Sequence, residues 1–311
     1  MNDRPPASPR AADAAQASLP LALVRLARPH QWIKNGFVLL GFFFYPRGWS
    51  DAPSALAVAQ VFTAFCLASS AVYVLNDVFD READRRHPQK RHRPLASGAV
   101  GVPLATAYGL VLAVGAAVLA ARVSPTALAL VAAYGAMNVA YSLGAKNVVI
   151  LDVFIIAGGF MLRLLAGTIG VGIVPSRWLL LCGLMVTLFL GFAKRRAELL
   201  ALKGEAGGHR RALEDYGPAF LDNMISVCAA GVLVTYSLYT VDAATVAIHR
   251  TDKLVYTVPL VLYGLFRYLY LLHRRGGAGD PSRDLFTDRH LLVTLLAWVG
   301  LTLFLLRGGL G

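Results

Sequence analysis

The chain has 311 residues, of which 57% are hydrophobic and only 15% are charged. Soluble domains carry about a quarter of their residues as charged side chains and under half as apolar ones, so this composition excludes an ordinary soluble globule, a disordered chain and a disulfide scaffold. The apolar residues come in nearly charge-free blocks of about 20 residues, the length that an α-helix needs to cross a bilayer. We therefore expect an all-α, polytopic membrane protein.

In chain order, residues 1–18 are rich in Ala, Pro and Arg and are expected to form a disordered cytoplasmic tail. Residues 19–311 are expected to form a single transmembrane domain. Arg28, Pro29 and Lys34 interrupt the first apolar segment, which predicts an interfacial helix that runs into a short span. Hydropathy predicts nine spans, near residues 20–45, 53–77, 102–121, 126–143, 148–169, 177–193, 219–241, 254–272 and 291–307.

The charge balance indicates how the chain is oriented. Lys and Arg number 30 against 18 Asp and Glu, a net charge of +12. In a membrane protein, Lys and Arg accumulate in cytoplasmic loops, so the excess points to topology and not to nucleic acid. With the predicted spans, 22 of the 30 fall on the side of the N-terminus. This predicts a cytoplasmic N-terminus, an outer C-terminus and a functional cytoplasmic face, where the predicted loops 78–100 and 194–218 gather ionisable residues. The sequence leaves open whether the protein forms a homo-oligomer.

A row of polar side chains ends the second predicted span. Asn76, Asp80 and Asp84 are spaced four residues apart, so they share one helix face at about 6 Å per step, whereas Asp77 and Glu82 point to other faces. Carboxylates are costly near hydrocarbon, and oxygen ligands without His or Cys favour a hard cation such as Mg²⁺ shared with a substrate phosphate. The alternative is a solvated acidic helix end. We expect a Mg²⁺ site.

A run of cations follows this acidic row at once and includes Lys90, Arg91 and Arg93. Such a pair of segments suits a metal–diphosphate site, because the metal takes bridging oxygens and the cations take the remaining charge. A positive-inside loop explains the same run. Beside the acidic row, we expect the three cations to bind substrate.

The acidic row resembles the first signature of the UbiA superfamily of intramembrane prenyltransferases, Asn-x-x-x-Asp-x-x-x-Asp. A second element of that family, a Tyr followed closely by a Lys, is similar to Tyr141 and Lys146. The second Asp-x-x-x-Asp row of the family, which helps to hold a prenyl diphosphate, is replaced here by Lys194, Arg195 and Glu198. A row with one acid and extra cations suits a different phosphate substrate. The alternative for Lys194 and Glu198 is a plain surface ion pair.

This departure resembles the decaprenyl-phosphate phosphoribosyltransferase branch of the family. Separated motifs agree with that branch in order, at residues 28–35, 76–94, 141–152, 194–198 and 209–216. The resemblance implies a UbiA-like bundle with a polar cytoplasmic mouth and a lateral apolar opening for a lipid tail. It also implies Mg²⁺ as the cofactor, phosphoribosyl diphosphate (PRPP) as the donor and a polyprenyl phosphate as the acceptor, with a product used in cell-envelope arabinan synthesis.

The implied reaction transfers 5-phosphoribose to the lipid phosphate and releases diphosphate. The C1–O bond of the donor can break dissociatively and the acceptor is already an anion, so no strong general base is needed. The sequence accordingly lacks a convincing Ser/His/Asp or Cys/His set. We expect Asp80, Asp84, Lys146 and Asp152 to be catalytic, and the following to bind substrate: Gln31, Lys34, Asn76, Lys90, Arg91, Arg93, Tyr141, Lys194, Arg195, Glu198 and Arg210.

Three ionisable residues within the spans leave alternatives open. Asp152, near the cytoplasmic end of the fifth span, is expected to bind ribose hydroxyls or the metal, with a structural role as the alternative. Arg163 lies three turns deeper on the same face and is either functional or a buried cation paired across the bundle. Arg267 in the eighth span is expected to be structural.

Two other functions remain open at this point. An ordinary UbiA prenyltransferase would move a prenyl chain from prenyl diphosphate to an aromatic acceptor, but the altered row at 194–198 argues against it. A transporter or flippase would use Asp152, Arg163 and Arg267 as a polar pathway. The concentration of polar residues on one face, without an evident inverted repeat, argues against that function.

Overall fold

The computed structural model describes residues 18–44, 52–202, 216–274 and 287–307, and within these ranges every regular element is a helix. The predicted tail 1–18 therefore falls, apart from Ser18, outside the described residues. The elements are α2 (Leu19–Ala27), η1 (Pro29–Gly36), α3 (Phe37–Phe43), α4 (Ala52–Phe79), α5 (Arg81–Arg86), η2 (Lys90–His92), α6 (Val102–Val123), α7 (Pro125–Leu143), η3 (Ala145–Asn147), α8 (Leu151–Ala166), η4 (Ile169–Val171), α9 (Arg177–Leu202), α11 (Pro218–Val241), α12 (Ala243–His249), η5 (Lys253–Thr257), α13 (Val258–Arg274) and α15 (Arg289–Leu306).

The described ranges hold eight helices that are long and apolar enough to cross a membrane. They are Ser54–Phe79, Val102–Val123, Pro125–Leu143, Leu151–Val171, Arg177–Leu200, Pro218–Val241, Lys253–Arg274 and Arg289–Leu306. Each overlaps one predicted span, so the multi-pass, all-helical prediction is confirmed and the count of nine is approximate. The remaining predicted span, residues 20–45, is broken into α2, η1 and α3. The break occurs because Arg28 adopts a left-handed conformation (φ 53°) and Pro29 follows it.

One predicted boundary is wrong. The sixth span was expected to end at residue 193, with a loop over 194–218, but α9 continues to Leu202. The segment after residue 193 is polar yet built from Lys, Arg, Ala, Glu and Leu, all good helix formers. Hydropathy marks where a helix leaves the membrane, and helix propensity carries it further. The row 194–198 consequently lies on a rigid helix.

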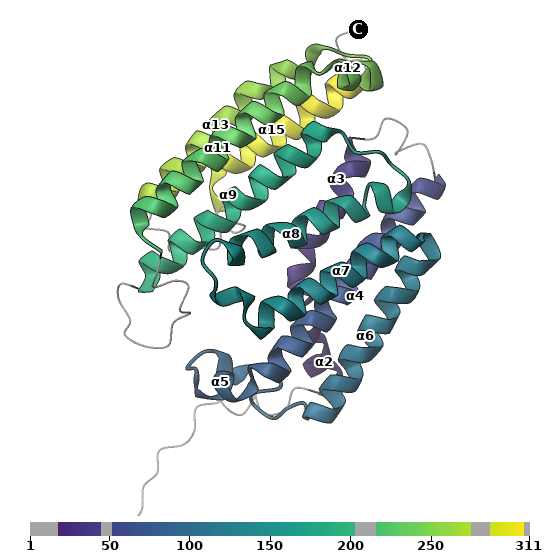
Figure 1. The fold of residues 1–311 in the computed structure, drawn as a ribbon, viewed down its shortest axis with the longest axis vertical. Helices are drawn as coiled ribbons and strands as arrows, with labels where there is room; N and C mark the ends of the chain where they lie inside the picture. Colours follow the sequence, from purple (N-terminus) through teal and green to yellow (C-terminus); the bar gives the residue numbers. More distant parts are fainter. Residues whose placement is uncertain (1–17, 45–51, 203–215, 275–286, 308–311) are drawn as a thin grey trace, which may run out of the picture.

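Consecutive long helices pack on one another from α4 through α6, α7, α8 and α9 to α11, while α13 packs on α11 and α15 (Figure 1). The short α3 contacts both α4 and α8. Glycine makes that contact possible: a Cβ on Gly167 would lie 1.8 Å from the carbonyl oxygen of Val38, and one on Gly41 would lie 2.1 Å from Thr168 Cγ2. Small residues at such a crossing let helix backbones approach closely in a membrane.

Arg163 ties three elements together in the middle of the bundle. It is 5% exposed, and its Nε donates to Asn35 Oδ1 of η1 (2.7 Å) while its Nη2 donates to the Tyr134 hydroxyl of α7 (2.9 Å). The guanidinium also lies 4.6 Å from the centre of the Tyr134 ring, a cation–π contact. The structural alternative for Arg163 is thus the one that the structure shows.

Arg267 on α13 is also structural, as expected. Its Nη2 lies 2.9 Å from Asp288 Oδ2, and Asp288 caps α15 by accepting a hydrogen bond from the Leu291 N–H. The Arg267 guanidinium lowers the pKa of the Asp288 carboxyl to about 2. This pair therefore joins the last two helices. The three cysteines, Cys66, Cys182 and Cys228, are free thiols.

Candidate active site

The predicted acidic row follows a nearly continuous helical path. The Asp80 N–H donates to the Asn76 carbonyl (2.9 Å) and the Asp84 N–H donates to the Asp80 carbonyl (2.8 Å), which carries the chain from α4 into α5. The side chains have different surroundings: Asn76 is partly buried, Asp80 is exposed and Asp84 is 3% exposed. The predicted spacing is present in the backbone, but the environment of each oxygen is set by neighbouring segments.

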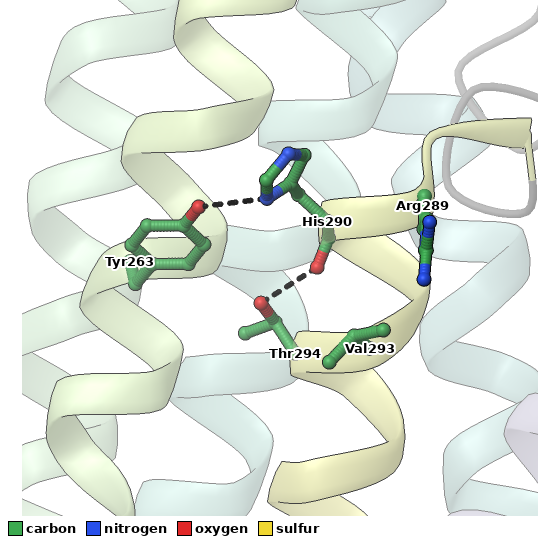
Figure 2. Close-up of a pocket in the computed structure, with 5 residues that line it drawn as sticks. All are labelled: Tyr263, Arg289, His290, Val293 and Thr294. Carbon is green, nitrogen blue, oxygen red and sulfur yellow. Dashed lines mark hydrogen bonds between the residues drawn. The ribbon is translucent and has the colours of Figure 1, made fainter.

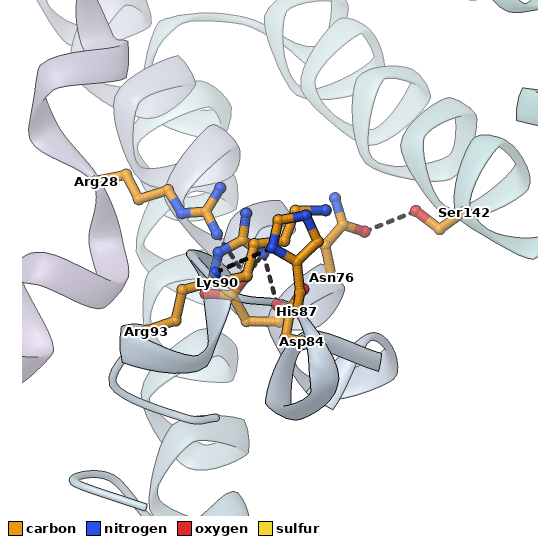
Figure 3. A network of polar contacts seen from close by, with 8 residues as sticks. Arg28, Asn76, Asp84, His87, Lys90, Arg93 and Ser142 are labelled. Carbon is orange, nitrogen blue, oxygen red and sulfur yellow. Dashed lines mark hydrogen bonds and ion pairs between the residues drawn. The ribbon is translucent and has the colours of Figure 1, made fainter. Parts of the chain in front are cut away.

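Arg93 bridges two of the nearby carboxylates. Its Nη1 lies 2.6 Å from Asp84 Oδ2 and 3.2 Å from Asp77 Oδ1. Asp77 is also paired with Arg28, whose Nη2 lies 2.5 Å from the same Oδ1. Figure 3 shows Arg28 reaching in from the segment after α2 and Arg93 from the loop after α5. Asp77 does lie on another helix face than the row, yet it is buried in the middle of this ion-pair network.

The remaining predicted residues of this region lie around the network. Lys90 and Arg91 are exposed, and η2 places them in the loop between α5 and Arg93. Gln31 and Lys34 are partly buried on η1. Lys90 and Arg91 are therefore exposed at the surface, whereas Arg93 is already paired with Asp77 and Asp84.

A second network is centred on Arg195 of α9, which is 2% exposed. Its Nε lies 2.6 Å from Asp152 Oδ2 on α8, and its Nη1 pairs with Glu198 on the next turn of α9. Its Nη2 donates to the Tyr141 hydroxyl of α7 (3.2 Å). Lys194 remains 47% exposed and its Nζ lies 3.9 Å from Glu198 Oε1. Lys194 is therefore accessible to a ligand, whereas Arg195 is buried and holds Asp152 and Glu198 in place.

Tyr216 completes the Arg195 network from the segment before α11. Its hydroxyl donates to Asp152 Oδ1 (2.7 Å) and accepts from the Ile150 N–H (2.6 Å). Ile150 has a φ of 71°, which is strained for a β-branched residue. Burial and the hydrogen bond to Asp152 raise the pKa of the Tyr216 phenol. Tyr216 thus holds both the strained turn before α8 and the buried carboxylate.

The end of α7 joins the two networks. Tyr141 accepts a hydrogen bond from Arg195, and the adjacent Ser142 donates to Asn76 Oδ1 (2.6 Å); Figure 3 shows Asn76 turned toward Ser142. Lys146 follows on η3 and is partly buried. The structure therefore links predicted residues of α4, α5, α7, α8 and α9 through these two networks and the Ser142–Asn76 hydrogen bond. Arg210 lies outside the described residues.

The oxygen donors of the acidic row fit a magnesium ion that is shared with a substrate. Within the described ranges, no three His, Cys, Asp or Glu side chains could hold a metal ion by themselves. Mg²⁺ does not require such a cage, because it is usually bound through one or two carboxylates, waters and substrate phosphates. Asp80 is exposed and its carboxylate makes no hydrogen bond or ion pair with a described residue. Of the three predicted donors, Asp80 is the exposed one, whereas the Asn76 amide oxygen accepts from Ser142 and Asp84 Oδ2 is paired with Arg93.

Four residues of the two networks were absent from the predicted site. Arg28, Ser142 and Tyr216 belong to motifs that the sequence showed, at 28–35, 141–152 and 209–216, so their motif membership was the signal. Asp77 was set aside because helical phase turned it away from the acidic row. Its burial against two arginines depends on contacts that are 49 and 16 residues apart in sequence, and no local pattern reports such contacts.

A cavity of about 390 Å³ lies elsewhere, between α13 and α15. It is lined by Tyr263, Arg289, His290, Val293 and Thr294, and Figure 2 shows the His290 ring facing the Tyr263 hydroxyl. None of these residues belongs to the predicted site. The polar end of α4, α7 and α9 remains the candidate active site.

Comparison with known proteins agrees with this architecture. The chain is 34% identical over 286 residues to the decaprenyl-phosphate phosphoribosyltransferase of Mycolicibacterium smegmatis, covering 89% of this chain and 90% of that protein. It is 32% identical over 289 residues to the protein of the same name from Mycobacterium tuberculosis, covering 91% and 93%. A solved UbiA homolog from Archaeoglobus fulgidus, bound to GPP and Mg²⁺, has the same fold, with a TM-score of 0.68 at 17% identity over 90% of this chain and 97% of that one.

Residues 36–289 match the UbiA prenyltransferase family. This range contains the acidic row, the basic loop and the altered row on α9. The protein is a multi-pass membrane transferase, and its chain belongs to the UbiA prenyltransferase family.

Proposed function

We propose that the protein transfers 5-phosphoribose from PRPP to a polyprenyl phosphate, with Mg²⁺ and on the cytoplasmic face of the membrane. Residues 19–311 act as one transmembrane domain, with the N-terminus in the cytoplasm. The observation that carries the proposal is the row at residues 194–198 of α9. There, an exposed Lys194 is followed by a buried Arg195 that is paired with Asp152, at the place where other family members have a second acidic row that helps to hold a prenyl diphosphate. The similarity over about 90% of the chain to proteins named decaprenyl-phosphate phosphoribosyltransferase supports it.

On the donor side, the residues of α4, α5 and the following loop bind the diphosphate of PRPP. Asn76, Asp80 and Asp84 would hold Mg²⁺, which, when bound, neutralises charge on the leaving diphosphate. Lys90 and Arg91 take the remaining phosphate charge, because they are exposed and form no ion pair with a carboxylate in the described part of the chain. Arg93 acts through Asp84, whose buried carboxylate it fixes at 2.6 Å.

On the acceptor side, Lys194 and Lys146 attract the lipid phosphate, since both are lysines at the end of the bundle near α7. Asp152 is 1% exposed and acts through Arg195, which it holds at 2.6 Å. Glu198 shares its carboxylate between Lys194 and Arg195. Gln31, Lys34, Tyr141 and Arg210 complete the substrate contacts.

The reaction needs alignment more than acid–base chemistry. The C1–O bond of PRPP breaks with its electron pair leaving on diphosphate, and an oxygen of the lipid phosphate forms the new bond to C1. Because that oxygen is already anionic, no proton has to be removed. The protein holds the two anions in line and stabilises the leaving group. The product is a lipid-linked phosphopentose, which would serve arabinan synthesis in the cell envelope.

The test uses the purified full chain with PRPP labelled in its diphosphate, a polyprenyl phosphate and Mg²⁺. We expect diphosphate release that requires the lipid phosphate. The same preparation is then offered prenyl diphosphate and 4-hydroxybenzoate as the alternative substrates of the family. Transfer from prenyl diphosphate without any release from PRPP would reject the proposal.

A further inference from the structure

The turn between α7 and α8 carries Lys146 and has an unusual backbone conformation. It begins at Gly144, whose φ is 155°, contains η3, and ends at Ile150, with φ 71° and ψ −49°. The angles at Ile150 lie close to those of the γ-turn with positive φ, which is rare and strained. A β-branched residue keeps such a conformation only where neighbouring segments impose it. The path of this turn therefore depends on contacts from outside it.

The hydrophobic core does little to hold this turn. None of the η3 residues is buried, and Val148 and Ile150 are 51% and 41% exposed. Val149 is partly buried and packs against a hydrophobic core cluster. Lys146 is also partly buried, and its ammonium forms no ion pair with a carboxylate in the described part of the chain. The position of Lys146 is therefore set by the backbone of the turn.

Tyr216 supplies a contact from outside the turn. Its side chain is 3% exposed, and its ring lies 6.1 Å from the ring of Phe220 at the start of α11. Its hydroxyl accepts from the Ile150 N–H (2.6 Å), at the strained position itself, and donates to Asp152 Oδ1 (2.7 Å). The described ranges show no second acceptor for the Ile150 N–H. Without the phenol oxygen, this N–H would lose its partner and the turn would lose the contact that opposes its strain.

We infer that Tyr216 is a positioning residue, which fixes Lys146 at the place where the acceptor phosphate binds. The inference rests on the proposed function for the role of Lys146. Tyr216 acts through the Ile150 N–H: this hydrogen bond keeps Ile150 at positive φ, and Lys146 lies four residues earlier in the same turn. An ammonium that is already fixed loses less conformational entropy when it meets the phosphate, so the acceptor binds more tightly and in one orientation.

The second hydrogen bond of Tyr216, to Asp152, does not carry this effect. Asp152 uses Oδ1 for Tyr216 and Oδ2 for Arg195, whose Nε lies 2.6 Å away. Arg195 also pairs with Glu198. Arg195 therefore keeps both acids when the phenol oxygen is removed, whereas the turn loses its hold. We expect the loss of the Tyr216 hydroxyl to act on Lys146 and to leave the row on α9 in place.

Tyr216→Phe deletes this single hydroxyl. We expect the Kd of the purified full chain for a long polyprenyl phosphate, measured without donor, to rise about tenfold, equivalent to about 1.4 kcal/mol. The Kd for PRPP should stay unchanged. Tyr236→Phe is the matched control, because Tyr236 is also buried and its hydroxyl is bonded to Trp298 and Thr257 at 2.7 Å each. It lies about 27 Å along α11 from Pro218. It should lower Tm as much as Tyr216→Phe does and change neither Kd.

Two double variants test the route through the turn. Lys146→Ala alone should weaken binding of the lipid phosphate at least tenfold, and adding Tyr216→Phe should weaken it no further. Glycine adopts positive φ without the strain of a β-branched residue, so Tyr216→Phe/Ile150→Gly should recover at least threefold of the lost affinity. Additive losses in the first double variant, or no recovery in the second, overturn the inference.

The binding constants separate this inference from the proposed function, because they need no turnover. Coupled losses without diphosphate release from PRPP would reject the proposed function and leave the positioning role standing. Release that requires the lipid phosphate, with an unchanged lipid-phosphate Kd in Tyr216→Phe, would reject the positioning role alone. If Tyr216→Phe does not fold by itself, the comparison is made in the Ile150→Gly background. There the phenol should change the lipid-phosphate Kd less than threefold, and a tenfold change would overturn the inference.

Discussion

The buried pair of Asp152 and Arg195 makes the sharpest prediction about stability. The two side chains are 1% and 2% exposed, and their atoms approach to 2.6 Å. Removing one partner of a buried pair costs about 3–5 kcal/mol, because the other charge is left uncompensated. Asp152→Asn preserves the shape and Glu198 still faces Arg195, so we expect the lower end of that range, about 3 kcal/mol. At about 2 °C per kcal/mol for a chain of this size, Tm should fall by about 6 °C.

The double variant Asp152→Asn/Arg195→Met tests whether the charges are coupled. Replacing both members of a buried pair is often neutral, so we expect its Tm to return to within about 2 °C of the wild type. If Arg195 also supports the phosphate site, turnover stays low in the double variant although Tm recovers. That separation distinguishes a positioning residue from a purely structural one.

The assay is a melt of the detergent-solubilised full chain followed by size-exclusion fluorescence, at one scan rate because unfolding is irreversible for many proteins of this kind. Glu82→Gln is the matched control. Glu82 pairs with Arg85 one helical turn away, and the two side chains are 67% and 41% exposed, so the loss should stay below about 1 kcal/mol. An unchanged Tm for Asp152→Asn, or a double variant as unstable as the sum of its single variants, would show that the pair is not coupled.

Three further predictions concern the site and the last helix pair. Asp80→Ala should lower turnover about 100-fold or more by removing an exposed oxygen donor, whereas the exposed Glu82→Ala should retain activity; near wild-type turnover of Asp80→Ala at low Mg²⁺ would contradict the metal assignment. Lys194→Asp with Glu198→Asp rebuilds a family-typical acidic row and should abolish transfer from PRPP, because repulsion replaces attraction at a phosphate; unchanged kinetics would show a solvated helix face. Because the folded-state pKa of Asp288 is about 2 against an ordinary 3.8, its ion pair with α13 stabilises the protein above about pH 4 and is lost as the pH falls toward 2. The Tm advantage of the wild type over Asp288→Asn should vanish over that interval, and an advantage that persists at pH 2 would count against it.

Local sequence patterns determined several features of this protein. Long charge-free blocks predicted the membrane helices. In hydrocarbon, every backbone N–H and C=O group needs a hydrogen-bond partner within the protein, and a single segment can supply these partners only as a helix. The spacing of Asn76, Asp80 and Asp84 predicted their shared path, since helix geometry depends only on residues three and four apart. Where hydropathy alone set a boundary, as at the end of α9, the prediction was wrong, because helix propensity continued past the membrane edge.

Only the tertiary structure decided which charges are used internally and which remain free. Arg93 and Lys90 lie three residues apart in one basic run, yet Arg93 is held by two carboxylates and Lys90 is exposed. Arg195 and Lys194 are neighbours on α9, yet Arg195 is buried against Asp152, 43 residues away in sequence. The physical reason is that burial and pairing depend on contacts between segments far apart in sequence, whereas composition and periodicity report only on the segment that carries them.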